Sequence, residues 1–155
     1  MFTKFFSLGL TFGLIFFSAC GDHKKDDRVI DKENGITGLK KNDPTFLRLM
    51  DTAQKYLPDF IASFQKHKGD TNYYYTIKSD YEENETHEHM WSSPVSITGN
   101  TIKCVFIDSA YELHNIKTGD TITMKLTDVE DWTIYDYSNR TKMGYFSEKY
   151  LKGQE

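Results

Sequence analysis

The chain has 155 residues, a formal net charge of −4 and two cysteines, and aromatic residues make up 15% of it. Once the N-terminal segment described below is set aside, the remainder is long enough for one hydrophobic core and too short for two. The acidic balance leaves no basic stripe, which argues against a nucleic-acid-binding protein.

The N-terminus has the order of a bacterial lipoprotein signal peptide. Lys4 supplies a positive charge, an apolar run extends from Phe5 to Ala19, and small residues precede Cys20. This pattern resembles a lipobox, with Phe17 where leucine is usual. The resemblance implies cleavage after residue 19, diacylation of the Cys20 thiol with palmitate-type chains, and a lipid anchor in a membrane of the cell envelope. An uncleaved membrane helix and a secreted soluble product are the alternatives.

Residues 20–42 are rich in charge and lack apolar periodicity. We therefore expect a flexible tether between the lipidated cysteine and a single domain of residues 43–155. Cys104 then has no disulfide partner within the chain. It lies in a predicted strand, so we expect a small buried apolar residue, with a nucleophilic thiol as the alternative.

The domain begins with two expected helices. Asp43 has the character of an N-cap and Pro44 that of a first helical residue. Apolar residues follow at three- and four-residue spacings as far as Leu57. Because Pro58 lacks a backbone donor, we expect the first helix to end near Leu57 and a second, short helix to run to about Lys66.

Beyond Thr71 the apolar period changes to two, which predicts strands. We expect an acidic turn over 80–85, a break at Pro94, a hairpin turn at Gly99–Asn100 and another turn over 117–120. The strands are expected around 71–78, 86–91, 95–97, 102–106, 122–126 and 132–136. The expected fold is α+β, with an N-terminal helical hairpin packed on one face of a meandering antiparallel sheet of five or six strands.

Three separated blocks carry a family resemblance: 43–60, 88–91 and 119–132. They resemble the YegJ-like domain, a bacterial domain of unknown function, over about residues 43–146. The resemblance implies no established activity and no catalytic residue. Related small domains occur in toxin-immunity clusters, which favours a protein-binding role by analogy. The motif residues are Glu88, His89, Met90, Trp91, Gly119, Asp120, Asp131 and Trp132.

One candidate chemistry is a metal site. His87 and His89 alternate along a predicted strand, so their imidazoles share one face. A metal site would need a further ligand from elsewhere, such as His67, His114 or an acid. A polar strand face is the simpler interpretation, and no cofactor is expected.

Two other constellations contain catalytic residue types. Asp128, Glu130 and Asp131 could provide a carboxylate pair for acid and base work, although turns and helix caps use the same residues. Asp108, Ser109 and His114 are the residue types of a hydrolase triad, but no glycine-flanked nucleophile elbow surrounds the serine.

Tyrosine is the aromatic residue in excess. The successive residues Tyr73, Tyr74 and Tyr75 must place rings on both sides of one strand, and Tyr135 and Tyr137 add to such a surface. Tyrosine is common at recognition surfaces, so these five residues form a candidate binding face, with plain sheet packing as the alternative. The sequence thus predicts a lipid-anchored protein-binding module, including an immunity-like or inhibitory one. The alternative is a metal-binding protein or metal-dependent enzyme.

Overall fold

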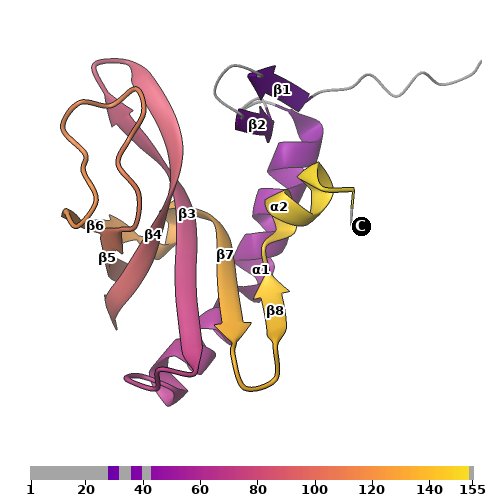
Figure 1. Ribbon diagram of the computed structural model, residues 1–155, viewed down its shortest axis with the longest axis vertical. Helices are drawn as coiled ribbons and strands as arrows, with labels where there is room; N and C mark the ends of the chain where they lie inside the picture. The colour runs from indigo at the N-terminus through magenta and orange to yellow at the C-terminus, as the bar shows by residue number, and fades with distance from the viewer. Residues whose placement is uncertain (1–27, 32–35, 40–42, 154–155) are drawn as a thin grey trace, which may run out of the picture.

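The computed structural model describes residues 28–31, 36–39 and 43–153 (Figure 1). The expected signal peptide, Cys20 and most of the expected tether lie outside these residues. The elements are β1 (Arg28–Asp31), β2 (Ile36–Leu39), α1 (Pro44–Lys66), β3 (Tyr73–Glu83), β4 (Thr86–Thr98), β5 (Thr101–Phe106), β6 (Thr121–Lys125), the 3₁₀ turn η1 (Leu126–Asp128), β7 (Val129–Asp136), β8 (Thr141–Gly144) and α2 (Phe146–Leu151). Within the expected tether, β1 and β2 pair as an antiparallel hairpin.

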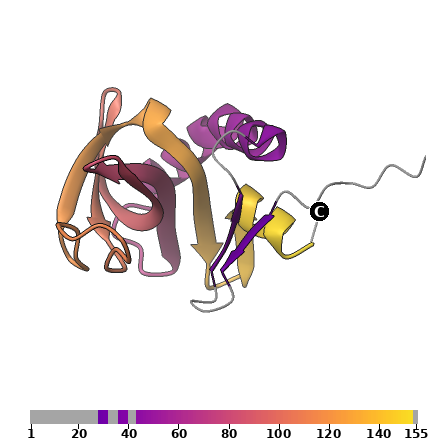
Figure 2. The same ribbon diagram turned by 90° about the horizontal axis from the view of Figure 1, so that it is seen from above.

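The expected α+β class is confirmed. Six antiparallel strands form one sheet in the order β6-β5-β4-β3-β7-β8. Strands β3 to β6 are sequential neighbours, as in the expected meander, whereas β7 returns to the far side of β3. Figure 2 shows that the sheet is strongly curled and that α1 lies along one side of it. Strand β8 and helix α2 were not expected from the sequence.

Helix α1 is a single helix of 23 residues that contains Pro58, so the expected helical hairpin is wrong. Its start is as expected, because the Asp43 carboxylate accepts hydrogen bonds from the backbone of Thr45 and Phe46. Pro58 lies on the exposed side of the helix, and the apolar stripe continues in phase through it with Leu57 and Phe60 both buried. Packing of this stripe holds the helix together across the missing hydrogen bond.

Two further strand boundaries differ from expectation. The acidic segment belongs to β3, and the turn is at Asn84 and Glu85, where both residues have positive φ, as a type I′ hairpin turn requires. Strand β4 continues through Pro94, where a bulge shifts its register against β5. Pro94 is tolerated because it lies beyond Ser92, the last residue of β4 that pairs with β3.

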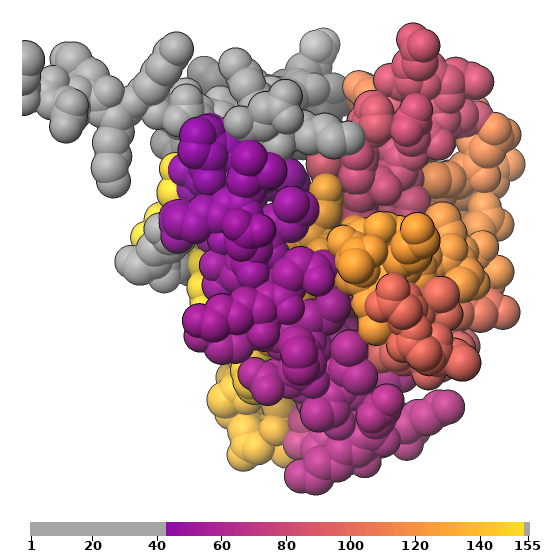
Figure 3. Space-filling model, turned by 180° about the vertical axis from the view of Figure 1, so that it is seen from behind, coloured from indigo at the N-terminus to yellow at the C-terminus, as the bar shows by residue number. Residues whose placement is uncertain are grey.

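The main core lies between α1 and the sheet. The Trp132 ring is 2% exposed and touches Phe60 at 5.5 Å between ring centroids. Figure 3 shows α1 covering this side of the molecule. The buried members are Ala53, Leu57, Phe60, Phe64, Tyr75, Ile77, Ile102, Cys104, Val129, Trp132 and Ile134. Inside the curl of the sheet, a smaller cluster contains Tyr81, Met90, Phe106 and Leu113.

Candidate binding face

The alternation of strand residues divides the five predicted tyrosines between the two sides of the sheet. Tyr73 and Tyr75 face the core, where Tyr75 packs edge-on against Phe60 and Phe64. The ring of Tyr73 stacks on His67 at the end of α1, with 3.9 Å between ring centroids. These two tyrosines are packing residues.

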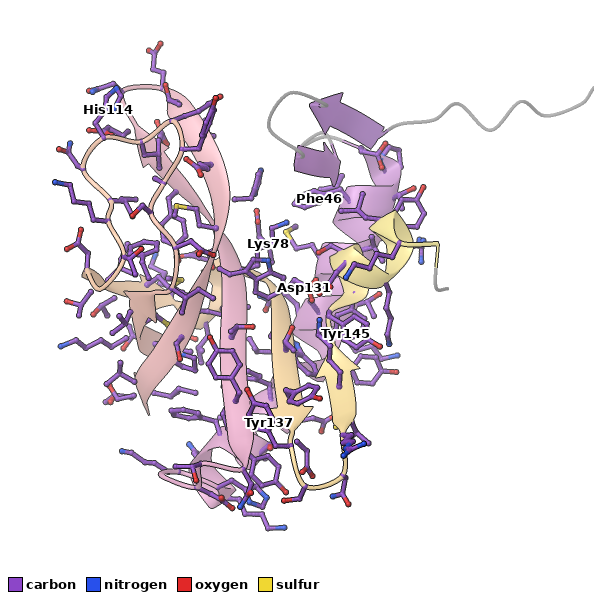
Figure 4. The ribbon with its side chains drawn as sticks, in the orientation of Figure 1. Phe46, Lys78, His114, Asp131, Tyr137 and Tyr145 are labelled. Atoms are coloured by element: carbon purple, nitrogen blue, oxygen red, sulfur yellow. The ribbon has the colours of Figure 1, made fainter. Side chains whose placement is uncertain are left out.

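The other three tyrosines gather on the opposite side. Tyr74 pairs with Tyr135 across β3 and β7, and the Tyr135 ring lies 4.6 Å from the ring of Tyr137. Tyr74 is 40% exposed and Tyr137 is 54% exposed. We call this side the open face; Figure 1 looks onto it, and Figure 4 labels two of its members, Lys78 and Tyr137. Its members are Tyr74, Thr76, Lys78, Trp91, Thr133, Tyr135, Tyr137 and Lys142.

A groove of about 330 Å³ runs over the open face. Its aromatic walls come from Tyr74, Trp91 and Tyr135, each on a different strand. The lining residues are Tyr74, Thr76, Trp91, Thr133, Tyr135, Lys142 and Glu148. Aromatic walls with a few polar groups are typical of binding sites. A second hollow of about 280 Å³ lies at the end of α1, between His67 and Pro94.

Charged side chains border the groove on the side of β8 and α2. Glu148 accepts hydrogen bonds from the ammonium groups of Lys142 and Lys152, each at 2.5 Å. Partial burial raises the pKa of Glu148, but these two bonds outweigh it and hold the pKa below the ordinary range. The Lys142 ammonium also lies 4.4 Å from the centre of the Tyr145 ring.

The two candidate metal ligands share a face, as predicted, but each has its own carboxylate partner. His87 Nδ1 lies 3.0 Å from Asp80, and His89 Nδ1 lies 2.7 Å from Glu130. Among the described residues there is no group of three or more His, Cys, Asp or Glu side chains that could hold a metal ion. The pair therefore supplies polar contacts within the strands.

The three candidate acids point to different places. Asp128 accepts a hydrogen bond from the backbone of Lys125, and Glu130 pairs with His89. Asp131 is 1% exposed and accepts hydrogen bonds from the backbone of Phe146 and Ser147, which caps helix α2. Burial raises the pKa of Asp131, and these hydrogen bonds act in the opposite direction. The arrangement is that of a structural cap.

The triad-type residues do not form a catalytic group. The Ser109 hydroxyl bonds to Thr118, and His114 is held through its backbone by Glu83. Figure 4 shows His114 at the outer end of the long loop, well away from Asp131. Cys104 is fully buried, and burial raises the pKa of its thiol to about 11. This thiol is therefore not an activated nucleophile.

Most motif residues have structural contacts. The Glu88 carboxylate accepts hydrogen bonds from the backbone of Tyr111 and Glu112, which fixes the loop after β5. Gly119 has φ of +93° in the turn that Asp120 closes by accepting from the backbone of Lys117. Met90 and Trp132 are core residues, and His89 pairs with Glu130. Of the eight motif residues, Trp91 alone lines the groove.

Several residues of the open face were not singled out from the sequence. Thr76 and Lys78 follow the tyrosine run at alternate positions, so strand periodicity already places them beside Tyr74. Lys142 and Glu148 come from β8 and α2, whose short lengths leave little periodic signal. The sequence therefore indicated the centre of the groove but not its charged border.

The structure defines a small α+β domain with an aromatic groove on one sheet face. The sequence profile described as "Uncharacterized protein conserved in bacteria (DUF2314)" matches residues 43–154. The chain belongs to this family, which confirms the resemblance to the YegJ-like domain of unknown function. No curated protein and no solved structure matched the chain.

Proposed function

We propose that this protein is a lipid-anchored protein of the bacterial cell envelope whose domain binds a protein partner through the open face. The observation that carries the binding role is the groove of about 330 Å³ walled by Tyr74, Trp91 and Tyr135. These rings lie away from the core and from α1. Large aromatic side chains with polar tips are enriched at protein interfaces.

The groove favours recognition over catalysis. The acids that could do acid and base work are engaged in a helix cap, in a turn and with His89, and they do not converge on the groove. An enzyme site needs polar groups that meet at one point, whereas a binding face needs area and shape. An immunity-like or inhibitory role, in which the domain blocks a partner, fits the same surface.

The lipid anchor is supported by the apolar run before Cys20 and by the return of charge immediately after it. No helix among the described residues is long and apolar enough to cross a membrane. The test is metabolic labelling with a fatty acid. Cys20→Ala should abolish the label and release the protein from membranes. Membrane retention without any label in the unchanged protein would instead indicate an uncleaved helix.

The binding role is tested by capture from a lysate of the source organism with the full-length protein. Tyr74→Ser should weaken recovery of a stoichiometric partner while leaving thermal unfolding nearly unchanged, because Tyr74 is 40% exposed. Tyr111→Ser is the matched control, since Tyr111 is 64% exposed on a loop outside the open face. Equal recovery by both variants would contradict the proposed face.

A further inference from the structure

The open face contains a cation whose charge is not directly paired. Lys78 lies in the middle of β3, and its ammonium lies 6.0 Å from the centre of the Trp91 ring. Across the described part of the chain, no hydrogen bond or ion pair reaches this ammonium. Burial lowers the pKa of Lys78, while the carboxylates of Asp131, Glu130 and Glu148 act in the opposite direction.

Each of these three carboxylates is already bonded to other donors. Asp131 caps α2 through the backbone of Ser147 and the Ser147 hydroxyl. Glu130 accepts from His89, and Glu148 holds two other lysines. Three carboxylates thus act on Lys78, but among the described residues none of them forms a hydrogen bond or an ion pair with its ammonium.

The Lys78 ammonium nevertheless remains accessible. No buried side-chain nitrogen or oxygen among the described residues lacks a hydrogen-bond partner, so the unpaired Lys78 nitrogen must keep contact with solvent. The residue is half-buried, and its ammonium lies near the Trp91 ring. A ligand that approaches the open face can therefore reach this charge.

Lys78 does not line the groove, but it follows two of the lining residues along β3. Side chains two residues apart on a strand are neighbours on the same face, so Tyr74, Thr76 and Lys78 follow one another along β3. Trp91 pairs with Lys78 across the strands and also lines the groove. A ligand that fills the groove with an apolar group would bring its next polar group to the Lys78 ammonium.

We propose that Lys78 and Trp91 bind a carboxylate that the protein partner carries next to an aromatic or other apolar side chain seated in the groove. This inference deepens the proposed binding role and rests on it. A single negative charge suits the site better than a phosphate, because three carboxylates already surround Lys78 and no arginine fork is present on the open face. The acidic net charge of −4 argues against a nucleic acid as the occupant.

The test uses the smallest pair of probes that contains this chemistry. Phenylacetate has an aromatic ring beside a carboxylate, and phenylacetamide has the same ring beside a neutral amide. Titration of the full-length protein by NMR should show binding of phenylacetate at least about tenfold tighter than that of phenylacetamide, since a charge-assisted hydrogen bond is the difference. Equal affinities, or no binding of phenylacetate, would overturn the proposal without reference to any variant.

Two variants then locate the site. Lys78→Met keeps the unbranched stem and should remove the preference for phenylacetate. Lys103→Met removes the same charge from an exposed position on β5 and should keep the preference. A preference that survives in Lys78→Met would overturn the assignment. Binding of oligothymidylate that depends on Lys78 would also overturn the assignment, because the occupant would then be a nucleic acid.

The result for Lys78 can be distinguished from the result for the proposed binding role of the open face. If the phenylacetate preference is absent while Tyr74→Ser still weakens capture of the partner, the open face binds protein and the role given to Lys78 is wrong. If Lys78 shows the preference but Tyr74→Ser has no effect on capture, the anion site exists and the proposed partner face is wrong.

Discussion

The indole nitrogen of Trp132 donates a hydrogen bond to the backbone carbonyl of Ala53 at 2.9 Å, and this bond joins strand β7 to helix α1. Both residues are buried, at 2% and 1% exposure. The same indole ring contacts Phe60 from α1 and Phe146 from α2. Trp132 therefore joins both helices to strand β7 and holds α1 against the core side of the sheet.

The first prediction concerns this contact. Trp132→Phe removes the hydrogen bond and leaves unfilled volume in a closed core, so we expect a loss of about 2–4 kcal/mol in the free energy of unfolding. Trp91→Phe is the control, because Trp91 lies on the open face and should cost less than about 1 kcal/mol. Denaturant unfolding measures both. A similar cost for the two variants would show that Trp132 does not hold the core together.

The second prediction concerns Gly144, which lies against the same tryptophan. Gly144 has φ of +77°, and a Cβ there would come within 2.2 Å of the Trp132 backbone oxygen and 2.5 Å of its ring. Because a backbone atom cannot easily move, Gly144→Ala should cost about 2–4 kcal/mol through overlap and strain together.

Gly119→Ala is the matched control for Gly144→Ala. Gly119 has φ of +93° with no atom within 4 Å of the added Cβ. We expect only the strain of a left-handed alanine, about 1 kcal/mol. Unfolding curves of the two variants separate overlap from strain. Equal costs would mean that the close approach to Trp132 relaxes easily.

Much of the fold follows from sequence periodicity, and the errors have identifiable causes. The strands and the apolar face of α1 were predicted because each pattern matches one period. The break at Pro58 was wrong because the local penalty of a proline is smaller than the packing of a stripe that continues through Leu57, Phe60 and Phe64. Helix α2 has six residues and depends on a cap from Asp131, which is remote in sequence.

The candidate face was partly visible in the sequence for the same reason. Period two assigns Tyr74 to the side opposite Tyr73 and Tyr75, but it does not say which side α1 covers. That choice depends on Trp132, which places the helix on the side of Tyr75. Lys142 and Glu148 join the groove through β8 and α2, whose positions only the tertiary structure shows.

The third prediction is a pH dependence at Glu148. Its folded-state pKa lies below the ordinary value of 4.5, so its ionised form contributes stability above that pH, and the contribution disappears as the pH falls through the folded-state value. At neutral pH, Glu148→Gln should therefore reduce the free energy of unfolding by less than about 1 kcal/mol, because the group is partly exposed to solvent.

The gap between Glu148→Gln and the unchanged protein should close as the pH falls below 4.5. Unfolding curves at neutral pH and in acid measure it. Glu112→Gln is the control, because this side chain is exposed on the far loop. A gap that widens in acid would contradict the role given to the bonds from Lys142 and Lys152.

The fourth prediction concerns Cys104, which is fully buried and has a thiol pKa raised to about 11 by burial. In a Cys20→Ala chain, where Cys104 is the remaining cysteine, iodoacetamide should react slowly with the folded protein at pH 8, because the thiolate is the nucleophile. Unfolding in denaturant should restore the ordinary rate. Rapid labelling of the folded protein would instead indicate an accessible, activated thiol.

The fifth prediction concerns Pro58, which lies inside α1 on its exposed side. Its ring cannot donate the backbone hydrogen bond that any other residue would make to Gln54, and a proline in a helix interior costs up to about 3 kcal/mol relative to alanine. Pro58→Ala should therefore raise the free energy of unfolding by about 1–3 kcal/mol. The greater conformational entropy of the unfolded alanine chain offsets part of this gain.

The matched control is Asp59→Ala, the next exposed residue of the same helix, which replaces a side chain without restoring a backbone donor. We expect a change within about 0.5 kcal/mol for this variant. Thermal unfolding measures both, and helical circular dichroism should stay the same. If Pro58→Ala lowers the stability instead, the proline itself favours the path of α1 along the sheet.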